Sequence, residues 1–258
     1  MFRRAPRCVL SLVLLGFIGL GVADEPPLEK GFRSLFNGKD LAGWHKNPAK
    51  IGHGTGGRWV VEDGAIVGEQ DPPGSGNGGI LLTDETFGDF EVVFEVKPDW
   101  GPDSGFFLRS TDKGQCYQMM IDFHDRGNVG EIYREGLDGA SNRTFQIDGV
   151  YEEGTGRLKS IVASATAEPE NQKRIDPAKW GEIWKFNDWN KIKIRCVGNP
   201  PTIDTWINGH HVTTYTSDKT FEGTLKERGH LAVQVHGGTG AWPKGTKIRF
   251  RRIAVKEL

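Results

Sequence analysis

The chain has 258 residues, of which 36 are glycine and only 36% are hydrophobic. This composition suits many short strands joined by tight turns, and it excludes a helical bundle. With 33 basic and 34 acidic side chains the formal net charge is −1, so no overall positive field draws the chain to nucleic acid or to an anionic membrane. We therefore expect neither of these as a partner.

Residues 1–23 have the organisation of a signal peptide: arginines first, then an apolar run over residues 9–20, then small residues before Asp24. The run is shorter than the ~20 residues that span a bilayer, although a retained, uncleaved anchor is the alternative. We expect cleavage near Asp24, export to the periplasm or the extracellular space, and a soluble mature protein without membrane attachment.

Two cysteines, Cys116 and Cys196, remain in the mature chain. The sequence leaves open whether they form a disulfide or stay as two buried thiols. No group of Cys and His residues has the spacing of a structural zinc site, so we expect no site of that kind.

Apolar and polar residues alternate through most of the mature chain, as is typical of half-buried strands, and the pattern is clearest over residues 90–96 and 191–196. We expect about twelve strands. A change of parity predicts a bulge near Arg251-Arg252. Asx-Gly pairs at three places predict tight hairpin turns: Asp63-Gly64, Asp148-Gly149 and Asn208-Gly209.

Two stretches interrupt the alternation. Residues 70–79 are rich in glycine and proline and predict a loop that borders a cleft or moves freely. Residues 160–179 predict an excursion from the sheet with one helical turn. No linker or repeat divides the chain, so we expect a single domain over residues 29–258. Alternating strands bury their apolar faces well in an all-β, antiparallel two-sheet sandwich, a jelly roll.

Several short motifs follow one another along the mature chain. They are the opening G-F-R-S-L-F-N-G-K-D-L-A-G-W at 31–44, W-V-V-E-D-G at 59–64, the strand between 79 and 94, S-G-F-F-L-R at 104–109, W-I-N-G at 206–209, Q-V-H-G at 234–237 and I-R-F-R-R-I at 248–253. Together they resemble the 3-keto-disaccharide hydrolase family. The resemblance implies a concanavalin A-like fold, as in lectins and glucanases, and an enzyme that cleaves glycosides already oxidised to a ketone at C3.

The implied reaction is elimination followed by hydration. A ketone at C3 acidifies the proton on C2, so a modest base removes it, an enolate forms and the glycosidic oxygen leaves C1. Addition of water to the resulting 2-hydroxy-glucal completes a net hydrolysis. Such a site needs a base, a cation or hydrogen-bond donor for the enolate, and an acid. It requires no cofactor, although a divalent cation is compatible with it.

The strand over residues 117–124 carries the first candidates. Alternation places Gln118, Met120, Asp122 and His124 on one face. Asp122 is the only carboxylate among them, which argues against the two-carboxylate mechanism of laminarinase-like enzymes. We expect His124 to be the catalytic base, oriented by Asp122, although a surface hydrogen-bonded pair at a strand end is the alternative. Gln118, where the family more often has Glu, is a candidate for substrate binding.

Further candidates lie on later motifs. His236 is a second catalytic candidate and shares a face with Gln234, a candidate for substrate binding. Arg109 has a fixed fork of donors that could hold sugar hydroxyls or the enolate, or form an ordinary salt bridge. Glu131 and Tyr133 share a strand face and are candidates for the acid and for a group that stacks on a sugar.

Aromatic and oxygen-rich segments add weaker candidates. Trp242, like Trp100 and Trp184, is a candidate for stacking on a sugar from a loop, although most tryptophans of β-sandwiches lie in the core. The oxygen-rich segment over residues 122–131 could hold a divalent cation, but its spacing matches no EF-hand loop.

Three function classes therefore remain. The whole-length resemblance favours a 3-keto-glycoside lyase and hydratase. The Gln at position 118 and the plentiful aromatic residues favour a non-catalytic carbohydrate-binding module of the cell envelope. The third class is a structural or interaction domain. Convergence of Arg109, His124 and His236 in one concave pocket would favour catalysis over the other two.

Overall fold

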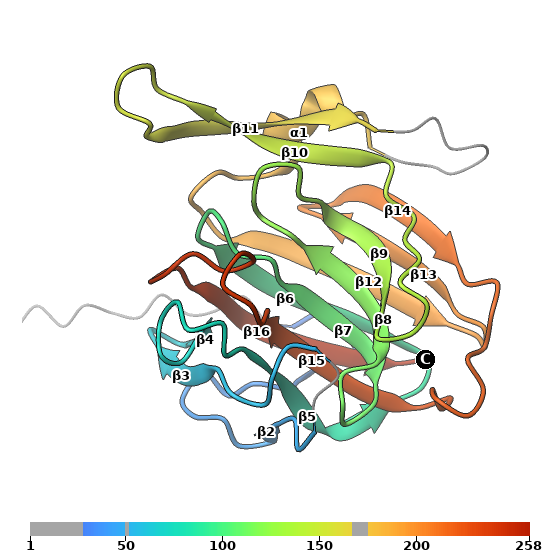
Figure 1. Cartoon of the computed structure of the whole chain (residues 1–258). Coiled ribbons are helices and arrows are strands. Elements are labelled where there is room, and N and C mark those ends of the chain that lie inside the picture. Colours follow the sequence, from blue (N-terminus) through green and yellow to red (C-terminus); the bar gives the residue numbers. More distant parts are fainter. Residues whose placement is uncertain (1–27, 50–51, 167–174) are drawn as a thin grey trace, which may run out of the picture.

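The computed structural model describes residues 28–49, 52–166 and 175–258, so the predicted signal peptide lies outside the described residues. Nearly all regular structure within them is strand, and every strand pairing is antiparallel (Figure 1). Two large sheets form a sandwich, which confirms the all-β fold class. No helix in these ranges has the length and apolar character needed to cross a membrane.

The larger sheet has eight strands. In spatial order they are β14 (His210–Thr216), β13 (Thr202–Ile207), β12 (Asn190–Val197), β6 (Phe90–Pro98), β16 (Ile248–Glu257), β4 (Ala65–Glu69) and β3 (Arg58–Glu62), with β1 (Arg33–Ser34) paired to β16.

The second sheet has six strands, and a two-stranded sheet stands apart from both. The six are β2 (Trp44–Lys46), β5 (Gly79–Phe87), β15 (Gly229–Val235), β7 (Gly105–Ser110), β8 (Cys116–Ile121) and β9 (Val129–Glu135). The two-stranded sheet is the hairpin of β10 (Phe145–Tyr151) and β11 (Leu158–Ala165), which lies at the top of Figure 1 beside the short helices η1 (Pro177–Lys179) and α1 (Trp180–Ile183).

The hydrophobic core lies between the two large sheets. Strand β6 alternates strictly between buried and half-buried residues, as its sequence predicts. Phe94 of this strand stacks on Phe106 of β7, with ring centroids 4.2 Å apart, and so joins the two sheets. Burial of a side chain of this size stabilises the fold by about 1.5–3 kcal/mol relative to leaving it exposed.

Two of the three predicted hairpin turns are confirmed. Asp63-Gly64 joins β3 to β4 and Asn208-Gly209 joins β13 to β14, and all four residues have positive φ angles. The third prediction was wrong, because Asp148-Gly149 lies inside β10, where Asp148 pairs with Val162 of β11. The predicted bulge is confirmed by a register shift between Arg251 and Ala254.

The predicted excursion at residues 160–179 was wrong in its first part and right in its second. Residues 160–165 belong to β11, while 177–183 form the single helical segment of η1 and α1; residues 167–174 lie outside the described part. The sequence pattern does not indicate this strand, because its outward Val162 is half exposed and breaks the alternation. The described ranges hold sixteen strands, more than the twelve expected, because several are very short.

The two cysteines are separate buried thiols, so the disulfide alternative is excluded. Burial raises the pKa of the Cys196 thiol to about 12. Burial also raises the pKa of the Cys116 thiol well above its ordinary value. Both cysteines therefore act as small packing residues rather than as reactive thiols.

Candidate active site

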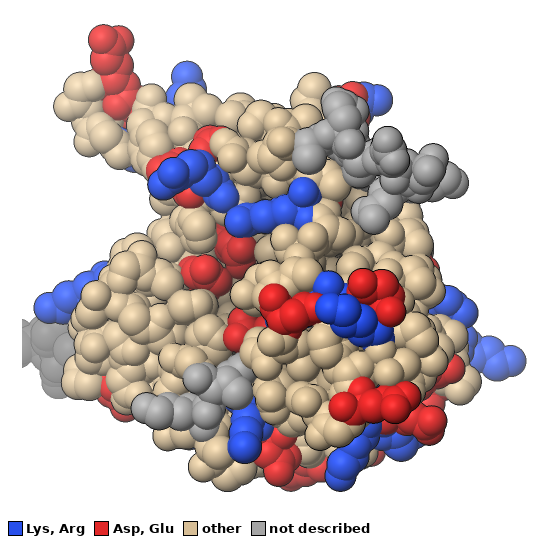
Figure 2. All heavy atoms as spheres, turned by 45° about the vertical axis from the view of Figure 1, so that its right-hand side comes forward, with Lys and Arg blue, Asp and Glu red and all other residues tan. Residues whose placement is uncertain are grey.

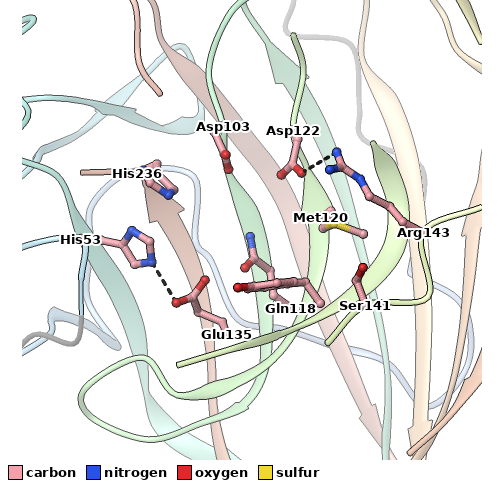
Figure 3. Close-up of a pocket in the computed structure, with 10 residues that line it drawn as sticks. His53, Asp103, Gln118, Met120, Asp122, Glu135, Ser141, Arg143 and His236 are labelled. Carbon is pink, nitrogen blue, oxygen red and sulfur yellow. Dashed lines mark hydrogen bonds and ion pairs between the residues drawn. The ribbon is translucent and has the colours of Figure 1, made fainter. Parts of the chain in front are cut away.

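A polar cavity of about 350 Å³ opens on the six-stranded sheet, on the face that points away from the sandwich core (Figure 3). The two faces of β8 explain its position, because Met119 and Ile121 enter the core whereas Gln118 and Met120 line the cavity. Strand β9 and several loops complete the wall, with Tyr133 and Glu135 from the strand and His53, Asp103, Asp122, Ser141, Arg143 and His236 from the loops.

One end of the cavity is formed by a buried contact between a histidine and a carboxylate. His53 Nε2 lies 3.1 Å from Glu135 Oε1, and their side chains are only 7% and 14% exposed. The His236 ring packs edge-on against the His53 ring, with centroids 4.3 Å apart. A Cβ on Gly237 would lie 2.6 Å from the His53 carbonyl oxygen, so glycine is needed for the two loops to meet. One oxygen of Glu135 therefore lies beside an imidazole.

The other end carries two carboxylates and a histidine. Burial, followed by the charge of Asp103, raises the pKa of Asp122 well above its usual range. Burial opposes ionisation of Asp103 too, but its contact with His124 and the charge of His236 lower the pKa of Asp103. The two pKa values therefore move apart, that of Asp122 upward and that of Asp103 downward, because a buried carboxylate and a partly buried one beside it cannot both ionise easily.

An arginine and a histidine flank this carboxylate pair. Arg143 Nη2 lies 3.3 Å from Asp122 Oδ2. His124 Nε2 lies 3.9 Å from Asp103 Oδ2, and this contact raises the pKa of His124 against the effect of burial. The predicted alignment of His124 with Asp122 thus gives way to a pairing with Asp103. Asp103, Asp122 and His124 each offer one ligand atom within 4.8 Å of the others, a donor set that could hold a divalent cation.

Gln118 lies between the two ends, as Figure 3 shows. Its Nε2 donates to the Ser104 carbonyl and to Gln234 Oε1, at 3.2 Å in each case. A Cβ on Gly105 would lie 2.2 Å from that same nitrogen, so the Ser-Gly pair of the S-G-F-F-L-R motif makes room for the amide. Gln234 is fully buried behind Gln118 and positions it, whereas it was expected to contact substrate itself.

Three of the sequence-predicted residues lie away from the cavity. Arg109 is 3% exposed and donates to the carbonyl groups of Gly88 and Gly198 and to Asp89, which makes it a clamp between two turns. Glu131 is fully buried and receives hydrogen bonds from Asn128 and Thr144. Trp242 is buried, and its Nε1 donates to the Thr246 carbonyl.

The structure therefore brings together only part of the predicted set. Gln118, Asp122, Tyr133 and His236 line the cavity and His124 adjoins it, but Arg109 does not converge with the two histidines. Sequence reasoning missed five lining residues, His53, Asp103, Glu135, Ser141 and Arg143, and it placed Met120 on the correct strand face without giving it a role. The parity of Tyr133 could have indicated Glu135, and Asp103 directly precedes a recognised motif. His53, Ser141 and Arg143 come from loops, which carry no such pattern.

The chemistry of the two ends differs. Glu135 has one oxygen paired to His53 and a second that is free of that contact, which suits a carboxylate that accepts a proton. Burial and the charge of Asp103 raise the pKa of Asp122, which lies beside Arg143, and a carboxyl with a raised pKa suits a group that gives a proton away. The cavity thus places a carboxylate suited to accept a proton and a carboxyl suited to give one on opposite sides of Gln118, an arrangement compatible with elimination and addition reactions.

Comparison with known proteins agrees with this architecture. The model of a family described as the 3-keto-alpha-glucoside-1,2-lyase-like domain matches residues 31–256. No curated protein matches the chain.

Solved structures resemble the chain over most of its length. A structure described as a native glycosidic hydrolase is 12% identical with a TM-score of 0.52, over 90% of this chain and 97% of its own. A "putative glycosyl hydrolase" from Parabacteroides distasonis ATCC 8503 is 19% identical with a TM-score of 0.50, over 88% and 99%. The Bacillus licheniformis beta-glucanase is 13% identical with a TM-score of 0.49, over 88% and 97%. At these identities the likeness concerns the fold alone, an antiparallel jelly roll of the concanavalin A-like type.

Proposed function

The chain belongs to the 3-keto-alpha-glucoside-1,2-lyase-like family, and from this membership and the cavity we propose that it cleaves 3-keto-glycosides by elimination and hydration. Membership gives a carbohydrate-active protein with a carbohydrate ligand. The observation that supports the finer proposal is the separation of the His53–Glu135 pair from the Asp103–Asp122 pair across Gln118.

In the elimination step the base lies at the histidine end. The free oxygen of Glu135 accepts the C2 proton while His53 holds the other oxygen in place. Electron density moves to the C3 oxygen as an enolate, and its return forms the C1–C2 double bond as the glycosidic oxygen leaves. Asp122 gives its proton to that oxygen, and the positive charge of Arg143 stabilises the carboxylate left behind.

In the hydration step the two groups exchange roles. Asp122, now ionised, accepts a proton from the water that adds to C1, and protonated Glu135 returns the proton to C2. All the protons balance, and no oxidant or cofactor is consumed. A divalent cation on Asp103, Asp122 and His124 would require ionised carboxylates and would replace the proton that this mechanism assigns to Asp122, so activity should be measured with and without a chelator.

Export is part of the proposal, on the sequence pattern of residues 1–23. N-terminal sequencing of the protein recovered from a host with a secretion pathway tests it directly. A chain beginning near Asp24 in the periplasm or medium supports export, and an uncleaved chain in the membrane fraction contradicts it.

The central experiment offers residues 24–258 a 3-keto-glycoside with a chromogenic aglycone, beside the unoxidised parent glycoside. We expect release from the ketone alone. Glu135→Gln and His236→Ala should slow it, Glu135→Gln by about 10²-fold or more. His45→Ala is a matched control, because His45 lies on β2 and is not among the residues that line the cavity.

Deuterium exchange separates the two proposed roles. In D₂O, Asp122→Asn should still exchange the C2 proton of the ketone but should release little aglycone, whereas Glu135→Gln should do neither. Release from the unoxidised glycoside would instead identify an ordinary glycosidase. Binding of either sugar without release or exchange would identify a carbohydrate-binding module.

A further inference from the structure

A hollow separates the β10–β11 hairpin from the body of the sandwich, with acidic side chains at its inner end and basic ones along its upper rim (Figure 2). Two aromatic residues, Trp100 and Tyr151, meet between the hairpin and the sandwich. Trp100 lies three residues before Asp103 on the connection between β6 and β7, and Tyr151 is the last residue of β10. One comes from the sandwich and the other from the hairpin.

Hydrogen bonds hold both aromatic rings in place. Trp100 Nε1 donates to Tyr151 Oη at 2.9 Å, and Tyr151 Oη donates to Asp125 Oδ2 at 2.9 Å. The other Asp125 oxygen accepts from the Gly149 backbone at 2.8 Å. Trp100 also packs edge-on against Phe123, with ring centroids 5.1 Å apart. Tyr151 is 44% exposed, whereas Trp100 is partly buried against the core, so this network fixes an aromatic pair whose more open member is Tyr151.

A short chain of contacts joins this aromatic pair to the carboxylate end of the cavity. His124 Nδ1 lies 2.9 Å from the Asp125 carbonyl oxygen, and His124 Nε2 lies 3.9 Å from Asp103 Oδ2. The connection that carries Trp100 is also tied down beside Asp103, because Gly101 donates to the Phe123 carbonyl and Phe123 donates to the Pro102 carbonyl. The aromatic pair is thus attached to the acid end and not to the base end.

This placement indicates which end of the cavity receives the leaving group. The acid protonates the glycosidic oxygen, so the oxidised ring lies between Glu135 and Asp122 and the leaving group lies beyond Asp122. We propose that Trp100 and Tyr151 form the subsite for the leaving group, and that they bind a ring-shaped aglycone, a sugar or an aryl group, through its apolar face. This inference rests on the proposed function, because the position of the leaving group follows from the role of the acid.

Substrates that differ only in the aglycone test it. With wild-type protein, Trp100→Ala and Tyr151→Ala, kcat and KM are measured on a 3-keto-disaccharide, an aryl 3-keto-glycoside and a methyl 3-keto-glycoside. We expect each variant to raise KM for the two ring aglycones by about five- to tenfold, and to change KM for the methyl glycoside far less. An effect on the disaccharide alone restricts the subsite to sugars, and one on the aryl glycoside alone restricts it to aryl groups.

Two further variants distinguish loss of the aromatic ring from other changes in the hairpin. Tyr151→Phe removes the hydroxyl group but keeps the ring, so most of the affinity should remain. Val162→Ala alters the neighbouring strand of the same hairpin, where Val162 is 50% exposed, and serves as the matched control. Equal effects of Tyr151→Ala on all three substrates would overturn the subsite, as would no effect on any, while leaving the proposed function in place.

A binding measurement separates failure of the subsite from failure of the proposed chemistry. If wild-type protein cleaves none of the ketones, titration of the disaccharide against tryptophan fluorescence is compared with Tyr151→Ala. Binding that weakens in the variant supports the subsite although the chemistry has failed. Equal binding, or none, overturns the subsite as well.

Discussion

Two buried carboxylates on neighbouring strands of the six-stranded sheet have opposite surroundings. Glu131 of β9 receives hydrogen bonds from the Asn128 amide and from the backbone and hydroxyl of Thr144, at 2.6–2.8 Å. Asp122, directly after β8, faces a second carboxylate and a half-exposed arginine across an open cavity. Burial raises the pKa of both. Burial alone therefore does not mark a reactive group; the chemistry of the partners does.

The largest expected effect comes from substitution of Asp122, the carboxylate at the cavity. Asp122→Asn should lower kcat/KM for a 3-keto-glycoside by about 10³-fold, because the amide keeps the shape but cannot give up a proton. The melting temperature should not fall, since the raised pKa of Asp122 favours its neutral carboxyl form, whose shape and lack of charge the amide keeps. Steady-state kinetics and thermal unfolding on the same preparation check both. A loss of less than tenfold would mean that Asp122 is not the acid.

Substitution of Glu131, in contrast, should lower the stability of the fold rather than the activity directly. Glu131→Ala should lower the free energy of unfolding by about 3 kcal/mol, because three buried donors lose their acceptor at once. Urea denaturation measures this, and Glu131→Gln, which keeps one carbonyl oxygen, should lose less. If instead activity disappeared while stability held, Glu131 would be the catalytic acid that its sequence position first indicated.

Arg109 belongs to the same comparison, because the sequence predicted that it binds substrate, whereas the structure places it away from the cavity. Arg109→Ala should lower the free energy of unfolding by about 2 kcal/mol, because the carbonyl groups of Gly88 and Gly198 lose their donor. KM for the ketone substrate should stay the same, as the residue lies away from the cavity. A raised KM at unchanged stability would return Arg109 to the binding site.

The smallest expected effect is a pH dependence of stability. The raised pKa of Glu131 means that the folded state holds the proton more tightly than the unfolded chain does. Its contribution to stability is therefore complete below the ordinary pKa of 4.5 and is lost as pH rises through the raised one. The free energy of unfolding of wild-type protein, relative to that of Glu131→Gln, should therefore fall as pH rises from the ordinary pKa to the raised one. The fall is about 1.4 kcal/mol for each tenfold difference in proton affinity between the folded and unfolded states. Urea denaturation of both proteins at a series of pH values measures it, and a difference that stays flat from pH 4 to pH 8 would contradict it.

Alternation predicts the strands and the faces that they expose, because that signal is local. It places Gln118 and Asp122 on the cavity side of β8, and it would place Glu131 and Glu135 together on β9. The two glutamates differ because Thr144, from a segment that folds back over β9, covers Glu131 and leaves Glu135 at the cavity. No local pattern contains that information. The same holds for His53 and Arg143, which reach the site through the packing of loops.

The cavity gathers side chains from residue 53 to residue 236, and the strands beneath it pair over comparable separations, as Gly79 does with Val235. A folding chain closes such pairings slowly, because the long intervening segment must first lose its freedom. Enzymatic activity should therefore return only when the last of these contacts forms. During refolding, recovery of activity should lag behind recovery of strand content, and truncation before residue 236 removes a wall of the cavity.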